Sequence, residues 1–215
     1  MIDLYAMGSP NVVKIYIALE EMGLPYTAHP VDVFNEQQFS AAFLRLNPNA
    51  KVPVIVDGDG PGGKSYTVFE SGAILQYLAE KTGQLLPTDP AQRWHTLQWL
   101  HFQMGGVGPM FGQLGFFNKF AGKDFEDKRP RDRYVAESKR LLGVMDAHLA
   151  QRQWFVVDTY TIADISMLGW VRNLIGCYEA RESVGVDQFK HVAVWLERGL
   201  ARPAVQRGLD IPKRG

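Results

Sequence analysis

The sequence predicts a mixed α/β domain followed by an all-α domain, and three observations support this. Short strand patterns alternate with helical patterns over residues 1–82. Residues 83–90, which contain one glycine and two prolines, are expected to form a linker. From residue 91 to residue 215, helical periodicity dominates and no strand pattern is of comparable strength. We therefore expect two domains, at 1–82 and 91–215, which a chain of 215 residues is long enough to form.

Residues 1–82 are expected to form one mixed sheet with helices packed on it. The expected elements, in chain order, are a strand at Ile2–Tyr5, a helix through Val12, Ile15, Leu19 and Met22, a strand at Tyr26–Val33, a helix at Phe39–Leu46, strands at Val54–Val56 and Tyr66–Phe69, and a helix from Ser71 to about Lys81. The first three elements form a right-handed βαβ unit. The two later strands predict an antiparallel hairpin with a long loop. The order βαβ, helix, ββα is typical of one layered domain.

The second half of the chain is expected to be helical. Its expected helices are Trp94–Met104, Tyr134–Leu149, Ile162–Leu174 and Val192–Leu200. Thr161 and Asp164 have the spacing of a capping box at the start of the third of these helices. Four phenylalanines follow a glycine-rich break and either line a hydrophobic substrate pocket or pack in the core: Phe111, Phe116, Phe117 and Phe120.

The charge balance and the lack of long apolar runs argue against several classes of partner. Lysine and arginine number 23, and aspartate and glutamate also number 23, so no global basic field exists to hold nucleic acid or an anionic membrane. No apolar run approaches the roughly 20 residues that a membrane helix needs. Met1–Tyr5 lacks the features of a secretory signal. We therefore expect a soluble, cytoplasmic protein with no nucleic-acid or membrane partner.

The chain has one cysteine and five histidines. Cys177 alone can form neither an intramolecular disulfide nor a cysteine-rich zinc site, and the histidines lack metal-ligand spacing. We expect no metal site. Redox chemistry would need a thiol from another molecule, because an unactivated cysteine behaves as a small apolar residue.

Two short motifs in the first half carry candidate binding chemistry. If the Val52-Pro53 bond is cis, the turn presents the Val52 backbone to an extended peptide ligand; otherwise Pro53 merely starts a strand. Glu70-Ser71 closes one strand and opens a helix. The unpaired amides at that helix start attract a carboxylate, and Glu70 suits an ammonium group. The alternative for Ser71 is an ordinary helix cap.

One ordered set of motifs spans the first half: Lys51-Val52-Pro53, then a hairpin, then Phe69-Glu70-Ser71-Gly72-Ala73-Ile74. This order and spacing resemble the glutathione-binding half of glutathione S-transferases. The Thr161–Asp164 box, together with Trp195–Arg198 and Ala201–Val205, extends the resemblance over nearly the whole chain. The resemblance implies a thioredoxin-like N-terminal domain, a C-terminal helical domain, glutathione as co-substrate and a homodimer.

Further segments are similar to a bacterial group called Nu-class: Ser9-Pro10-Asn11, and Gln98-Trp99 through Gly105–Met110. That group is similar to disulfide-bond reductases, which hold two glutathiones, or glutathione disulfide, in one site. The resemblance implies that Asn11 and Ser9 donate hydrogen bonds to the glutathione sulfur, with Ser9 in place of the group's threonine. It also implies a set of glutathione-binding residues, namely Gln38, Lys51, Val52, Pro53, Glu70, Ser71 and Arg133.

The expected activity is glutathione-dependent reduction of disulfide bonds, with a bound glutathione thiolate rather than a protein cysteine as nucleophile. Two alternatives stay open. One is a transferase that conjugates glutathione to small hydrophobic electrophiles, with Ser9 as the main donor. The other is a glutathione-binding protein without catalysis, because fold alone does not define function. Arg133 can equally be a solvated helix arginine, and Ser9 a turn residue.

Overall fold

The computed structural model describes residues 1–156 and 158–211. Their packing divides the chain into two compact units, one formed by Met1–Gln84 with the residues from Arg202 onward, the other by Leu85–Ala201. The final helix α10 (Pro203–Leu209) therefore packs in the first unit, against α1 (Pro10–Met22). The expected division into domains at 83–90 stays a prediction.

The first unit is built on a four-stranded mixed sheet. Its strands are β1 (Ile2–Ala6), β2 (Tyr26–Pro30), β3 (Val54–Asp57) and β4 (Tyr66–Phe69). They lie in the order β2-β1-β3-β4, with β1 and β2 parallel and the other two pairs antiparallel. The arrangement confirms the expected βαβ unit followed by an antiparallel hairpin, and it is a thioredoxin-like α/β fold.

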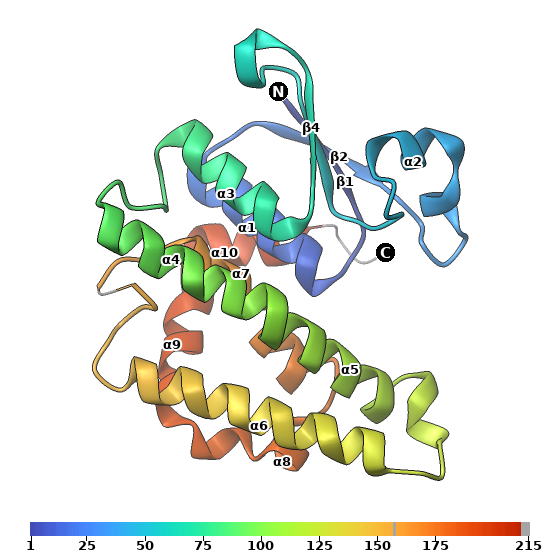
Figure 1. Ribbon diagram of the computed structural model, residues 1–215, viewed down its shortest axis with the longest axis vertical. Helices are drawn as coiled ribbons and strands as arrows, with labels where there is room; N and C mark the ends of the chain where they lie inside the picture. The colour runs from blue at the N-terminus through green and yellow to red at the C-terminus, as the bar shows by residue number, and fades with distance from the viewer. Residues whose placement is uncertain (157, 212–215) are drawn as a thin grey trace. The chain divides into compact units, whose positions relative to one another are not determined.

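Three helices connect and cover this sheet. They are α1, α2 (Ala41–Leu46) and α3 (Ser71–Thr82), with α1 and α3 packed together on one side of the sheet and α2 on the other (Figure 1). Val12, Ile15 and Leu19 on α1 are fully buried, as their helical spacing predicts. The helix ends at Gly23, whose φ of 63° is a conformation that glycine adopts without steric cost.

Two predicted boundaries in the first unit are wrong. The second strand ends at Pro30 rather than Val33, because the Asp32 side chain accepts hydrogen bonds from the Phe34 and Asn35 amides and turns the chain. The helix expected at Phe39–Leu46 begins at Ala41. A short 3₁₀ turn, Gln37–Phe39, precedes it, and Ser40 caps the helix by accepting from the Phe43 amide.

Helix α10 returns from the far end of the sequence to hold α1 in place. Arg202 donates from Nε and Nη2 to the two carboxylate oxygens of Glu21, at 2.6 and 2.8 Å. Gly208 lies directly on the α1 backbone, because a Cβ at that position would stand 2.7 Å from the amide nitrogen of Ile17. The N-terminal turn of α1 is thus part of a firmly packed helix.

The second unit is helical, as expected. Its helices are α4 (Pro90–Phe102), α5 (Gly108–Asn118), α6 (Arg129–Leu149), α7 (Ile162–Ile175), α8 (Arg181–Val184) and α9 (Lys190–Leu200). The predicted capping box at the start of α7 is confirmed: Thr161 Oγ1 accepts from the Ala163 amide at 3.2 Å, and Asp164 Oδ2 accepts from the Thr161 amide at 3.0 Å.

The expected glycine-rich break is not a break. A π-helical turn at Gln103–Val107 joins α4 directly to α5, and Pro109 follows it, so the wider turn lies just where a proline removes one backbone donor. Of the four phenylalanines of α5 and its end, Phe111 packs in the core as one of the alternatives predicted, and a substrate-pocket role for the others stays a prediction. Phe111 is fully buried, Phe117 stacks on Tyr134 at 5.7 Å, and Phe116 and Phe120 are exposed.

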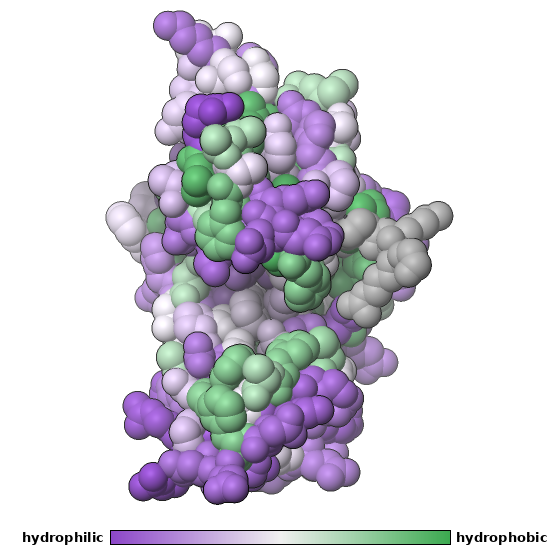
Figure 2. Space-filling model, turned by 90° about the vertical axis from the view of Figure 1, so that its right-hand side faces the viewer, coloured by the Kyte–Doolittle hydropathy of each residue, from purple (hydrophilic) through white to green (hydrophobic). Residues whose placement is uncertain are grey.

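On the face drawn in Figure 2, hydrophilic and hydrophobic side chains are interspersed. Among the helices that the structure describes, none combines the length and the apolar character needed to cross a bilayer.

Candidate functional site

The first unit contains a cavity of about 250 Å³ where three chain segments meet. The segments are the first turn of α1, the loop that leads into β3, and the turn between β4 and α3. The lining residues are Asn11, Asn47, Lys51, Val52, Pro53, Glu70 and Ser71. Apart from Asn47, every one of them belongs to the set that the sequence motifs imply for glutathione. Segments up to 60 residues apart therefore meet at one cavity, and the binding role of these residues stays a prediction.

The loop before β3 is shaped by a buried asparagine. Asn47 is 1% exposed; its Nδ2 donates to the Lys51 carbonyl at 2.7 Å, and its Oδ1 accepts from the Asn49 amide at 2.9 Å. Ala50 has a φ of 53°, an uncommon conformation for a residue with a Cβ. The Val52-Pro53 peptide bond is cis. Val52 thus lies at the cavity just ahead of the β3 ladder, which begins at Val54.

Sequence reasoning missed Asn47. The only signal was turn chemistry, since Asn47-Pro48-Asn49 is typical of a tight turn whose asparagine side chain bonds its own backbone. A buried residue that supports a binding loop through backbone hydrogen bonds is not part of a recognisable ligand-binding motif. Its role became visible through the two hydrogen bonds that fold the loop over it.

The turn between β4 and α3 holds an unusual helix start. Glu70 is the N-cap residue of α3, has a φ of 68°, and makes no side-chain cap bond. Such a backbone conformation in a residue with a Cβ costs free energy and is found mostly at functional sites. Ser71 is the first helical residue and is 4% exposed; its hydroxyl donates to Asn11 Oδ1 at 3.4 Å. The ordinary serine cap considered from the sequence is therefore wrong, because Glu70 holds the cap position.

Ser9 occupies a different place from the other candidates. It is the N-cap residue of α1, and its Oγ accepts from the Val12 amide at 3.3 Å. It is not among the residues that line the cavity. A hydroxyl that accepts one bond keeps its own proton to donate, so capping and donation to a ligand are compatible. Ser9 is thus a helix cap two residues before Asn11.

Gln38 and Arg133 do not join the cavity residues. Gln38 lies in the 3₁₀ turn and donates from Nε2 to the Val33 carbonyl at 3.3 Å, while its Oε1 is buried and has no hydrogen-bond partner within the described part of the chain. Arg133 belongs to the helical unit, on α6, where it is exposed. There Arg140, and more weakly Arg133, hold the pKa of Glu137 below its usual value.

A buried charge that sequence reasoning missed stands beside the cavity residues. Lys14 lies on α1 one turn after Asn11 and is fully buried. Burial lowers the pKa of Lys14 to about 7, and the negative charge of Glu70 acts in the opposite direction. Lysines are almost never fully buried unless paired, so a lysine at a core position of an amphipathic helix was the signal in the sequence.

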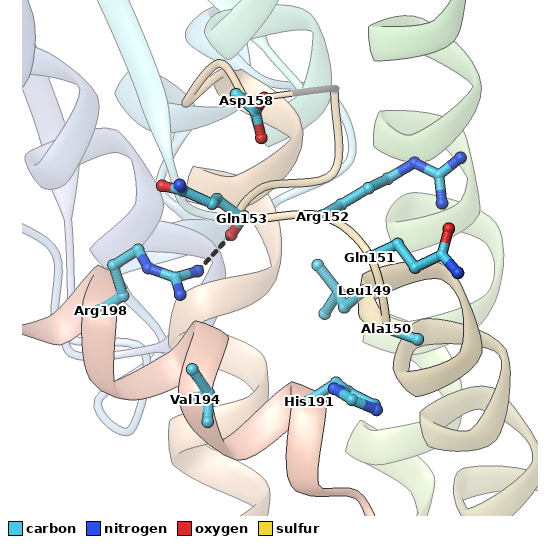
Figure 3. A pocket seen from close by; sticks show the side chains of 9 residues that line it. All are labelled: Leu149, Ala150, Gln151, Arg152, Gln153, Asp158, His191, Val194 and Arg198. Atoms are coloured by element: carbon cyan, nitrogen blue, oxygen red, sulfur yellow. Dashed lines mark hydrogen bonds between the residues drawn. The ribbon is translucent and has the colours of Figure 1, made fainter.

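Two further cavities involve none of the implied binding residues. One, in the helical unit, is about 380 Å³ and is lined by residues from the end of α6, the following loop and α9 (Figure 3). Its wall is fastened by Arg198, which donates to the Gln153 carbonyl at 2.6 Å. The other, in the first unit, is about 480 Å³ and lies beside the stacked rings of Tyr5 and His29. Cys177 is a free, exposed thiol.

Known proteins with related sequences match both halves of the chain. Residues 8–81 match the glutathione S-transferase N-terminal domain, and residues 109–203 match the C-terminal domain. Disulfide-bond oxidoreductase YfcG of Escherichia coli is 41% identical over 210 residues, which span 97% of this chain and 94% of that protein.

Solved structures give the same result. A glutathione transferase from Pseudomonas putida, with one glutathione disulfide bound per subunit, is 62% identical with a TM-score of 0.96, and the match covers 98% of this chain and 91% of that one. A family member from Pseudomonas fluorescens, with two glutathiones bound, is 58% identical with a TM-score of 0.97 over 98% of this chain and 93% of that one. The protein described here therefore belongs to the glutathione S-transferase family.

Proposed function

We propose that this protein is a glutathione-dependent disulfide-bond reductase. The observation that carries the proposal is the cavity where Asn11, Lys51, Val52, Pro53, Glu70 and Ser71 converge. These residues come from three segments of the sequence. Their side chains and backbone supply complementary groups for each end of a γ-glutamyl tripeptide.

Each binding group contacts a different part of the ligand. The Glu70 carboxylate pairs with the ligand's α-ammonium group, and the open N-terminus of α3 with the Ser71 hydroxyl receives its α-carboxylate. The Val52 backbone, ahead of the β3 ladder, bonds the peptide in an extended conformation. The Lys51 ammonium pairs with a carboxylate of the ligand. Gln38 and Arg133 complete the proposed set.

The proposed reaction transfers two electrons from two glutathiones to one disulfide. Asn11 and Ser9 donate hydrogen bonds to the glutathione sulfur and favour its thiolate. The thiolate attacks one sulfur of the substrate disulfide and forms a mixed disulfide, while the other sulfur leaves as a thiolate and takes a proton from water. A second glutathione thiolate attacks the glutathione sulfur of the mixed disulfide. Glutathione disulfide forms, and the second substrate thiol is released.

The relatives support this reaction over others on the same fold. YfcG carries the name of a disulfide-bond oxidoreductase, and the two Pseudomonas structures hold glutathione disulfide or two glutathiones. A site for two glutathiones fits a reaction that consumes two. The protein's own cysteine is not required, because both attacking sulfurs belong to glutathione.

The test is glutathione-dependent reduction of a small disulfide, followed as NADPH oxidation through glutathione reductase. The unmodified protein is expected to turn over, and Asn11→Ala to lose about 10- to 1000-fold in kcat/KM, the range for one donor to a developing anion. Gln92→Ala removes an exposed amide side chain from α4 and is the matched control, with unchanged turnover expected.

Each other outcome assigns a different function. Turnover of an electrophile such as a halogenated nitrobenzene, with Ser9→Ala inactive and Asn11→Ala mildly affected, would replace the proposal by conjugation. Glutathione binding without turnover of either substrate class would make the protein a binding protein. A homodimer and a cytoplasmic location are further proposals from the family resemblance, and light scattering of the purified protein tests the first.

A further inference from the structure

Lys14 is the one fully buried lysine among the residues that the structure describes, and the proposed reaction leaves it without a role. It lies on the helix face that otherwise contributes Ile15, Ala18 and Leu19 to the core. Burying a lysine is costly, and an apolar side chain of the same length would serve the core as well or better. Core packing therefore does not explain a lysine at this position, whereas an interaction with a nearby charged group would.

That group is Glu70. The charge of Glu70 is the interaction that opposes the effect of burial on Lys14. A second contact joins the same two segments, because the Ser71 hydroxyl donates to Asn11 Oδ1. Residues three apart on a helix lie on one face, so Lys14 lies on the same face of α1 as Asn11, which contacts Ser71. The start of α1 thus interacts with two consecutive residues, with Ser71 by a hydrogen bond and with Glu70 by charge.

Glu70 needs such support more than an ordinary surface glutamate does. Its φ of 68° is unfavourable for a residue with a Cβ, and no cap bond from its side chain fixes it to α3. A carboxylate on a strained, exposed turn has many orientations available unless a partner restricts it. Lys14 is buried and does not line the cavity, so it supplies that restriction without blocking the cavity side.

We propose that Lys14 is a positioning residue, which holds the Glu70 carboxylate toward the α-ammonium group of the γ-glutamyl ligand. The inference rests on the proposed function. The selectivity for the α-amino group then depends in part on Lys14, a side chain that does not line the cavity. Lys14 then contributes to the affinity only for ligands that carry the α-amino group.

The experiment is calorimetric titration with two ligands, glutathione and its analogue that lacks the α-amino group. Lys14→Met is expected to weaken glutathione binding about tenfold, in line with the loss of one interaction between charged groups, and to change binding of the analogue by less than about twofold. Its melting temperature is expected to stay equal or rise, because an apolar group replaces a buried charge. A purely structural role would lower stability and affect both ligands alike.

A double-mutant cycle with Glu70→Gln identifies the partner. In that background Lys14→Met is expected to change glutathione affinity by less than about twofold, since the carboxylate it positions is gone. Equal losses for the two ligands, additive losses in the cycle, or tighter glutathione binding by Lys14→Met would each overturn the inference and leave the proposed function standing. Absence of glutathione binding by the unmodified protein would overturn both.

Discussion

Two helix N-termini of this chain are built in opposite ways. At the start of α7, Thr161 and Asp164 satisfy each other's backbone in a complete capping box. Asp164 is fully buried and also accepts from the Phe155 amide at 3.1 Å and from Trp195 Nε1 at 2.9 Å. At the start of α3, Glu70 makes no side-chain cap bond and is exposed.

The difference separates a terminus that holds the fold from one that is open to a ligand. The first amides of any helix lack partners within the helix, and their dipoles favour negative charge. In α7 the chain's own carboxylate meets that need and ties together three segments of the helical unit. In α3 the N-cap residue makes no such side-chain bond, and the helix start lies at a cavity. The same local physics thus gives a structural joint in one unit and a proposed carboxylate site in the other.

The largest expected effect comes from dismantling the closed terminus. Asp164→Ala leaves the Trp195 indole N–H and two backbone amides without their acceptor in the core, and we expect a loss of about 3–5 kcal/mol in the free energy of unfolding. Urea denaturation followed by fluorescence measures it. Asp187→Ala, which removes an exposed partner of Arg181, is the control and is expected to cost less than about 1 kcal/mol. Similar losses in the two variants would refute the structural role.

The pH dependence of stability tests the same carboxylate. Burial raises the pKa of Asp164 to about 6 from its ordinary 3.8, against the four donors that favour its charged form. Between these values the folded protein keeps a proton that the unfolded chain has released. This contribution to stability is therefore full below the unfolded pKa and is lost as the pH rises through the folded pKa, by at most about 1.4 kcal/mol per pH unit.

The measurement compares the unmodified protein with Asp164→Asn at several values between about pH 4 and pH 7. The difference in the free energy of unfolding, unmodified minus variant, is expected to decrease across this window and to level off above it. An increase instead would mean that the donors from Thr161, Phe155 and Trp195 outweigh burial and lower the pKa.

A matched pair of serine and threonine changes compares the two termini directly. Thr161→Ala is expected to cost about 1–2 kcal/mol of stability, as a lost N-cap does, and to leave glutathione affinity unchanged. Ser71→Ala breaks the 3.4 Å bond to Asn11 and removes no N-cap side chain, so we expect less than about 1 kcal/mol in stability but about a tenfold loss of affinity. Thermal unfolding measures the stability of both variants, and calorimetric titration measures their glutathione affinity. If Thr161→Ala and Ser71→Ala lose stability and glutathione affinity in the same proportion, the two termini do not differ in role.

The sequence was informative where one short segment carries the whole signal. Strand and helix periodicity predicted the sheet, the spacing of Thr161 and Asp164 predicted the box, and the motifs around Val52 and Glu70 predicted most of the cavity lining. Each of these depends on residues close together in the chain or on a recognised order of motifs.

What the sequence did not predict depends on packing between distant segments. Helix α10 joins the first unit because Arg202 meets Glu21 and Gly208 meets Ile17, contacts across more than half of the chain. Lys14 read as one more residue of α1 because its partner lies far along the sequence. The turn at Glu70 could not be seen either, since a left-handed conformation is expected of glycine and not of glutamate.

The smallest expected effect concerns a third terminus, at α1, where Ser9 combines the two modes. Its oxygen caps the helix, as Thr161 does, and its hydroxyl proton is proposed to serve the glutathione sulfur. Ser9→Gly keeps an acceptable N-cap residue and removes the hydroxyl without adding a donor, so we expect stability within about 0.5 kcal/mol of the unmodified protein but reduced disulfide reduction. Ser9→Ala is expected to lose about 1 kcal/mol in the free energy of unfolding and to show the same reduction in activity.

Both variants are compared by urea denaturation and by the coupled disulfide assay. If Ser9→Gly retains full turnover while Ser9→Ala loses it in step with stability, Ser9 acts only as a cap, and Asn11 alone favours the thiolate. If both lose turnover equally while only Ser9→Ala loses stability, the hydroxyl proton is the functional group. A capped helix end and a ligand donor are then one residue, because a hydroxyl can accept from the backbone and donate outward at the same time.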